Sequence, residues 1–184
     1  QKQEAKAREI LLRADKAGNG EGLPADAILA QLYAERGDLA AAKASLADAL
    51  KLNPKSPAVL ALSITTALEE NDLDGAWNLA QKLYAEDKSP DVLKVYGNVC
   101  LFRADYAGAE AAFQEAVRQN SLDADAIGGL ALALCEQDDA DKRARAIQYA
   151  ASNLQRQANN RDCLGILGWA QYKSGDLDAA LNTL

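Results

Sequence analysis

The sequence predicts an all-α fold built from repeated helix-turn-helix units, and three observations lead to that prediction. Hydrophobic residues make up 49% of the 184 residues and are mostly Ala and Leu, whereas aromatic residues make up 5%. Ala and Leu have the highest helix propensities and allow helices to pack closely. Apolar residues recur every three or four positions, and a Gly-Asp-like turn signal recurs at an almost constant interval.

The Asp residue of each turn measures the interval. Asp38, Asp72 and Asp105 are separated by 34 and then 33 residues, Asp139 follows 34 residues later, and Asp176 follows after a further 37. A period near 34 residues is typical of a helix-turn-helix repeat. We therefore expect about eleven helices in a single solenoid segment. The expected units are approximately 1–22 (partial), 23–56, 57–89, 90–123, 124–160 and 161–184 (partial).

Each unit keeps the same frame around its turn. A first helix precedes the Asp, and a second helix with packing residues at helical spacing follows it. The predicted packing residues of the second helices are Ala42, Leu46 and Ala49 in the first full unit, Ala109, Phe113 and Ala116 in the third, and Ala180 and Leu184 in the last. Residues 3–17 show the same spacing, so we expect a second helix there and interpret the chain as a segment of a longer array.

These motifs resemble the tetratricopeptide repeat (TPR) family. The segments that carry the resemblance are Leu164-Gly-Ile-Leu167-Gly168, Gly175-Asp176-Leu177 with Ala180, and Tyr96-Gly97 with Ala109, Phe113 and Ala116. The resemblance implies a right-handed α-solenoid of antiparallel helix pairs, with the first helix of each pair lining the concave surface. The second and fourth units depart from the pattern. Ser63-Ile64 and Ala80 are unusual in the second; Ala131, Asn153 and about three extra residues near the turn are unusual in the fourth.

The composition argues against catalysis, cofactors and nucleic acid. The chain has no His, so it lacks the commonest general acid/base and metal ligand. Cys100, Cys135 and Cys163 are far apart and are interpreted as small buried hydrophobic residues. The net charge is -7 without a long basic run, which disfavours nucleic acid, and no apolar run is long enough to span a bilayer. We expect no enzyme activity, cofactor, metal or small-molecule substrate.

One acidic stretch could be mistaken for a calcium loop. Glu70, Asp72 and Asp74 alternate before Gly75, as at the start of an EF-hand, but the residue where the final Glu should stand is Gln81. We interpret Asp72 as a helix N-cap followed by acidic first-turn residues.

The expected site is the surface of the first helices. The residues projected onto it are Ile28, Gln31 and Glu35; Leu62, Thr65 and Glu69; Lys94, Val95, Asn98 and Phe102; Asp125, Leu132 and Glu136; and Ile166, Trp169, Tyr172 and Lys173. The partner-binding residues predicted among them are Gln31, Thr65, Lys94, Asn98, Phe102, Trp169 and Tyr172. Trp169 and Tyr172 have an alternative role, in which they pack against a continuation of the array.

The predicted function is a protein–protein interaction scaffold that binds a peptide or partner protein in its concave groove. Lys94 and Asn98 alone do not make the Lys/Asn/Arg clamp of the chaperone-binding TPR proteins. Two alternatives stay open: a spacer or assembly segment of a cell-envelope or secretion machine, and a regulatory array fused to an enzyme domain. Both a cytoplasmic and a periplasmic or envelope location are compatible with the sequence.

Overall fold

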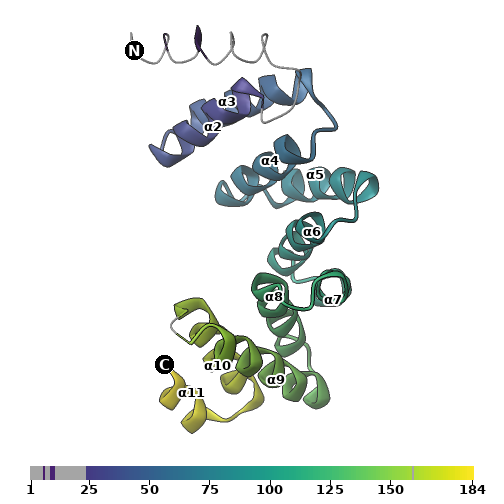
Figure 1. Cartoon of the computed structure of the whole chain (residues 1–184), viewed down its shortest axis with the longest axis vertical. Helices are drawn as coiled ribbons and strands as arrows, with labels where there is room; N and C mark the ends of the chain where they lie inside the picture. Colours follow the sequence, from purple (N-terminus) through teal and green to yellow (C-terminus); the bar gives the residue numbers. More distant parts are fainter. Residues whose placement is uncertain (1–5, 7–8, 11–23, 159) are drawn as a thin grey trace. The chain divides into compact units, whose positions relative to one another are not determined.

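The computed structural model describes Lys6, Glu9, Ile10 and residues 24–158 and 160–184. Within this part the regular structure is entirely α-helical, and the helices follow one another as antiparallel-connected pairs (Figure 1). The helix expected over residues 3–17 lies, apart from three residues, outside the described part. The chain divides into two compact units, residues 1–87 and 88–184.

The described part of the first unit contains two helix pairs. Its described helices are α2 (Ala25–Glu35), α3 (Leu39–Leu52), α4 (Pro57–Glu69) and α5 (Leu73–Glu86). Each helix packs against the next, and the two first helices, α2 and α4, also touch. The core of this unit is rich in small residues, such as Ala42 and Ala49 of α3 and Ala76 and Ala80 of α5, which are at most 1% exposed.

The second unit contains three pairs. Its helices are α6 (Pro90–Phe102), α7 (Tyr106–Gln119), α8 (Ala124–Cys135), α9 (Ala140–Arg156), α10 (Arg161–Ser174) and α11 (Leu177–Thr183). The first helices of successive pairs pack side by side, α6 on α8 and α8 on α10. The second helices α7 and α9 pack against both of their neighbours in the sequence.

In each described helix pair, the recurring Asp of the sequence is the N-cap of the second helix. Its Oδ1 accepts a hydrogen bond from the backbone N–H three residues later, which satisfies one of the donors that a helix N-terminus leaves free. These bonds, 2.9–3.1 Å long, join Asp38 to Ala41, Asp72 to Gly75, Asp105 to Gly108, Asp139 to Lys142 and Asp176 to Ala179. The N-cap interpretation of Asp72 is thereby confirmed.

A left-handed residue precedes the N-cap Asp in four of these five turns. Gly37 and Gly175 have φ values of 77° and 90°, and Asn71 and Ala104 have φ values of 59° and 58°. Gly adopts this conformation without strain and Asn tolerates it, whereas Ala does so at a cost. The Gly-Asp turn signal thus has a steric origin in the tight connection between the two helices.

One detail of the sequence interpretation needs correction. The three extra residues of the fourth repeat lie in α9, which has 17 residues where α3, α5 and α7 have 14, and not near the turn. Leu184 is 80% exposed, but its side chain lies against Gly168 of α10, where an added Cβ would be 2.8 Å from Cγ of Leu184; Ala180 is buried. The other packing residues predicted for the second helices, including Leu46 and Phe113, are buried.

Candidate functional site

A cavity of about 480 Å³ lies on the second unit, where the first helices of three successive repeats meet. Helices α6, α8 and α10 supply most of its lining, and α7, α9 and the connection between α9 and α10 supply the rest. The lining residues are Asp91, Lys94, Val95, Asn98, Phe113, Ala124, Asp125, Gly128, Gly129, Leu132, Asn153, Gln157, Asn160, Asp162, Cys163 and Ile166. We call it the α6–α8–α10 cavity.

Two glycines of α8 line this cavity and allow neighbouring helices to approach closely. Gly128 and Gly129 are buried within α8, and a Cβ at Gly128 would lie 2.9 Å from Cδ1 of Ile166. The ring of Phe113 from α7 lies against Gly129. Because neither glycine has a side chain, Phe113 of α7 and Ile166 of α10 approach the α8 backbone closely, and both contribute to the cavity lining.

Asn153 of α9 also lines the cavity and is 2% exposed. Its Nδ2 donates a hydrogen bond to the backbone oxygen of Ala124 at 2.9 Å. Its Oδ1 is buried and accepts no hydrogen bond. A buried acceptor without a donor is unfavourable. Asn153 is therefore an unusual residue at a repeat position where a small apolar residue is expected.

Lys94 is held at the rim by two carboxylates. Its Nζ lies 3.1 Å from Asp91 Oδ1 and 2.9 Å from Asp123 Oδ2, and its side chain is 20% exposed. Partial burial by itself lowers the pKa of Lys94, but hydrogen bonds to Asp123 and Asp91 outweigh it and raise the pKa above the usual value. Lys94 therefore stays protonated, and its charge is compensated by its own neighbours.

Cys163 is the thiol of the cavity, and it is not activated. Burial raises its pKa, and the carboxylates of Asp162 and Asp125 raise it further. Burial also raises the pKa of Cys100 to about 11 and that of Cys135 to about 12. A nucleophilic cysteine needs a lowered pKa, so none of the three is poised for attack. All three are buried and free, as the sequence predicts.

The structure brings together part of the projected surface. Six of the projected residues line the α6–α8–α10 cavity: Lys94, Val95, Asn98, Asp125, Leu132 and Ile166. Of the residues predicted to bind the partner, Lys94 and Asn98 are among these six. Phe102 is 61% exposed at the C-terminal end of α6, outside the cavity lining. Gln31 of α2 and Thr65 of α4 are exposed in the first unit.

Trp169 and Tyr172 of α10 form a separate surface cluster. Their rings stack with centroids 5.3 Å apart, and they are 42% and 52% exposed. The indole N–H of Trp169 donates to Glu136 at 2.7 Å. Nζ of Lys173 lies 2.8 Å from the same carboxylate and 5.7 Å from the Trp169 ring centroid. This cluster joins α10 to the end of α8 and does not line the cavity.

Sequence reasoning missed the contribution of α9 and of the connection that follows it. Asn153, Gln157 and Asn160 line the cavity, whereas the predicted surface consists of first-helix residues. One signal was present, because Asn153 stands where the repeat usually has Ala. A polar residue at a small, buried position is informative, since burial of an amide requires a partner.

A second, smaller cavity lies in the first unit. It has a volume of about 180 Å³ and is lined by α3, α4 and α5, including Leu46, Thr66 and Leu79. Glu70 of its rim pairs with Lys43 at 2.6 Å. None of the predicted partner-binding residues lines it.

Among the described residues, no group of three or more Cys, Asp or Glu side chains is placed to hold a metal ion. In the same part of the chain, each helix is too short or too polar to cross a membrane.

No protein-family model and no curated protein sequence matches the chain. Solved structures of TPR proteins do resemble it. A TPR protein from Parabacteroides merdae superimposes with a TM-score of 0.79 at 17% identity, over 98% of this chain and 70% of that one. PilW, a type IV pilus biogenesis factor, superimposes with a TM-score of 0.76 at 20% identity, over 86% of this chain and 74% of that one. YrrB, described as a TPR protein with an unusual peptide-binding site, superimposes with a TM-score of 0.68 at 19% identity, over 96% of this chain and 89% of that one. Together with the helix pairs and their recurring caps, these similarities show that the chain has the tetratricopeptide repeat fold.

Proposed function

We propose that the chain is a non-catalytic interaction scaffold that binds an extended segment of a partner protein in the α6–α8–α10 cavity. The observation that carries the proposal is that three successive first helices line one cavity and supply six projected residues to it. A cavity of about 480 Å³ accommodates a few side chains of a peptide rather than a folded domain.

The lining suits a peptide in two respects. Val95, Leu132 and Ile166 provide apolar surface on three helices, and burial of apolar area is the main source of affinity. Asn98 and Gln157 provide amide groups that can donate and accept hydrogen bonds along a peptide backbone. The absence of an activated thiol in the cavity supports a binding role over a catalytic one.

A library of fluorescent octapeptides tests this function. Binding of the pooled library to the whole chain is measured by fluorescence anisotropy, followed by enrichment of individual sequences. The variant Asn98→Ala/Leu132→Ala should lower the affinity for the enriched peptides at least tenfold, because it removes an amide and an apolar contact from the cavity. Gln114→Ala, an exposed change on the second helix α7, is the control and should leave affinity unchanged. Equal affinities for both variants would contradict the proposal, as would a library that yields no binder.

The similarity to PilW favours one second candidate, an assembly segment of a cell-envelope machine. In this role the chain would connect other components, and its surface contacts would matter more than the cavity. An export signal or lipid-attachment motif upstream in the gene, together with fractionation to the envelope, supports this candidate. A gene without such a signal opposes it.

A further inference from the structure

Two carboxylates of the α6–α8–α10 cavity lack a compensating charge. Asp125 and Asp162 are the second residues of α8 and α10, and both line the cavity. Neither carboxylate has an ion pair or hydrogen bond to another described residue. Both line the cavity together with Cys163, and their charges raise the pKa of its thiol.

The cation of the cavity does not neutralise them. Among the described lining residues, Lys94 carries the positive charge, and it is already shared between Asp91 and Asp123. The cavity therefore presents a net negative potential around Asp125 and Asp162. Partial screening by solvent weakens this potential but does not change its sign.

Asn153 supplies an independent indication of the kind of group that the cavity could bind. It lines the same cavity, is 2% exposed, and has an Oδ1 without a hydrogen-bond donor. Since its Nδ2 is held by Ala124, the amide orientation is set and the free group is an acceptor. Asn153 can therefore accept a hydrogen bond from an N–H or O–H donor.

On this basis we infer that the cavity selects peptides that present a Lys or Arg side chain. The positive charge lies between Asp125 and Asp162, and an N–H of the same group donates to Asn153. Val95, Leu132 and Ile166 contact the aliphatic part of that side chain, as long charged side chains often bury their stems. The inference rests on the proposed function and specifies the class of peptide. The preferred peptide is thus basic, whereas the clamp of the chaperone-binding TPR proteins binds an acidic tail.

An acidic residue in the first turn of a helix is common because it interacts favourably with the helix dipole. Asp178 illustrates this, since it is also the second residue of its helix, α11, and it is outside the cavity lining. This makes Asp178→Asn a matched control for Asp125→Asn and Asp162→Asn. All three changes remove one charge at the same helix position.

The experiment measures anisotropy with five octapeptide pools that are degenerate except for a central Lys, Arg, trimethyl-lysine, Gln or Glu. The whole chain should bind the Lys and Arg pools at least tenfold more tightly than the Gln pool, and the Glu pool most weakly. Trimethyl-lysine keeps the charge but has no N–H donor, so the affinity for its pool should lie between the affinities for the Lys and Gln pools. Asp125→Asn/Asp162→Asn should remove the preference for Lys, while Asp178→Asn retains it.

The outcomes separate this inference from the proposed function. Binding of all pools with equal affinity, or a Lys preference that survives Asp125→Asn/Asp162→Asn, overturns the inference and leaves peptide binding intact. Equal affinities for the trimethyl-lysine and Lys pools would contradict the proposed hydrogen bond to Asn153. If no pool binds, the proposed function itself fails. Circular dichroism and thermal melting of each variant show whether it is folded.

Discussion

Phe113 and Gly129 are in such close contact that a Cβ atom on Gly129 would lie 2.4 Å from Cε1 and Cζ of the ring. A Cβ on Gly97 of α6 would lie 2.8 Å from the same ring. Phe113 of α7 is thus packed between glycines of two successive first helices, and it is 1% exposed. This side chain connects two repeats and forms part of the cavity lining.

Gly129→Ala should destabilise the protein because the ring of Phe113 has to move. Overpacking of this kind costs about 1–3 kcal/mol. Gly165→Ala in α10 is the matched control, since a Cβ there meets nothing within 4 Å. That change should stabilise the protein by about 0.5–1 kcal/mol through helix propensity. Urea unfolding of the whole chain measures both; a Gly129→Ala variant as stable as Gly165→Ala would contradict the packing described.

Ala104→Gly should stabilise the protein, although glycine usually destabilises a helical protein. Ala104 has a φ of 58°, which is unfavourable for a residue with a Cβ. Relief of this strain exceeds the added entropy of the unfolded chain by about 0.5–1 kcal/mol. Gly175→Ala, at the equivalent position with a φ of 90°, should have the opposite effect. Thermal melting measures the two shifts, and shifts of the same sign would disprove the shared turn conformation.

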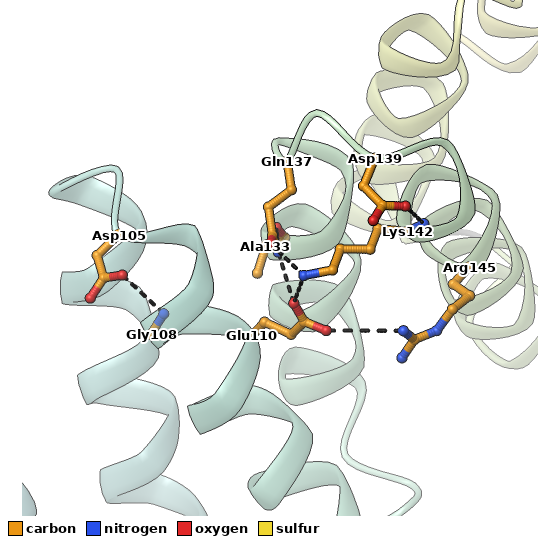
Figure 2. Close-up of polar contacts among 8 residues, drawn as sticks. All are labelled: Asp105, Gly108, Glu110, Ala133, Gln137, Asp139, Lys142 and Arg145. Carbon is orange, nitrogen blue, oxygen red and sulfur yellow. Dashed lines mark hydrogen bonds and ion pairs between the residues drawn. The ribbon is translucent and has the colours of Figure 1, made fainter.

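Asp105→Ala should cost about 1 kcal/mol because it removes the N-cap of α7. The lost contact is the 3.0 Å hydrogen bond from the backbone N–H of Gly108 to Oδ1 (Figure 2). Asp105→Ser keeps an acceptor and should retain most of the stability. Unfolding curves in urea check this. Equal losses of stability for the two variants would show that a side-chain acceptor at this position does not stabilise α7.

Glu110 of α7 connects its repeat to the next one and should make stability depend on pH. Figure 2 shows its carboxylate facing Gln137, Lys142 and Arg145, with Oε2 accepting hydrogen bonds at 2.8 Å from Gln137 and 2.7 Å from Lys142. Its side chain is 15% exposed. Partial burial by itself raises the pKa of Glu110, but hydrogen bonds from Lys142 and Gln137 outweigh it and lower the pKa below 4.5.

A lowered pKa in the folded state means that the ionised form stabilises the fold. This stabilisation is present above the unfolded-state pKa and is lost as the pH falls through the folded-state pKa. Glu110→Gln should therefore cost about 1–3 kcal/mol at pH 7, and its difference from wild type should shrink between about pH 5 and about pH 3. Urea unfolding as a function of pH measures this, and a difference independent of pH would rule out the ion pair as its cause.

Glu115→Gln is the control for that experiment, because Glu115 lies on the same helix. Hydrogen bonds from Arg118 and Gln119 lower the pKa of Glu115 to about 2. The pair with Arg118 is on the surface and lies within one turn of α7, where such pairs contribute little. Its loss should leave stability nearly unchanged at pH 7.

The sequence by itself determined the helix pairs, because local chemistry specifies them. An Asp that caps a helix, a left-handed residue before it and small residues at helical spacing act over a few positions, so their recurrence is visible without a structure. The repeat frame also projected Lys94 and Asn98 onto a first-helix surface, and both residues line the α6–α8–α10 cavity.

The tertiary structure decided what the linear pattern could not express. Only packing shows that Phe113 fits between Gly97 and Gly129. Only packing brings Asn153 of α9 and Asp162 of α10 to the same cavity as Asp125 of α8. The spacing of residues along one helix predicts which face they share, but contacts between helices depend on side-chain volumes at the crossing points. For that reason the scaffold could be predicted from the sequence, whereas the acidic and unpaired polar groups of the cavity emerged from the fold.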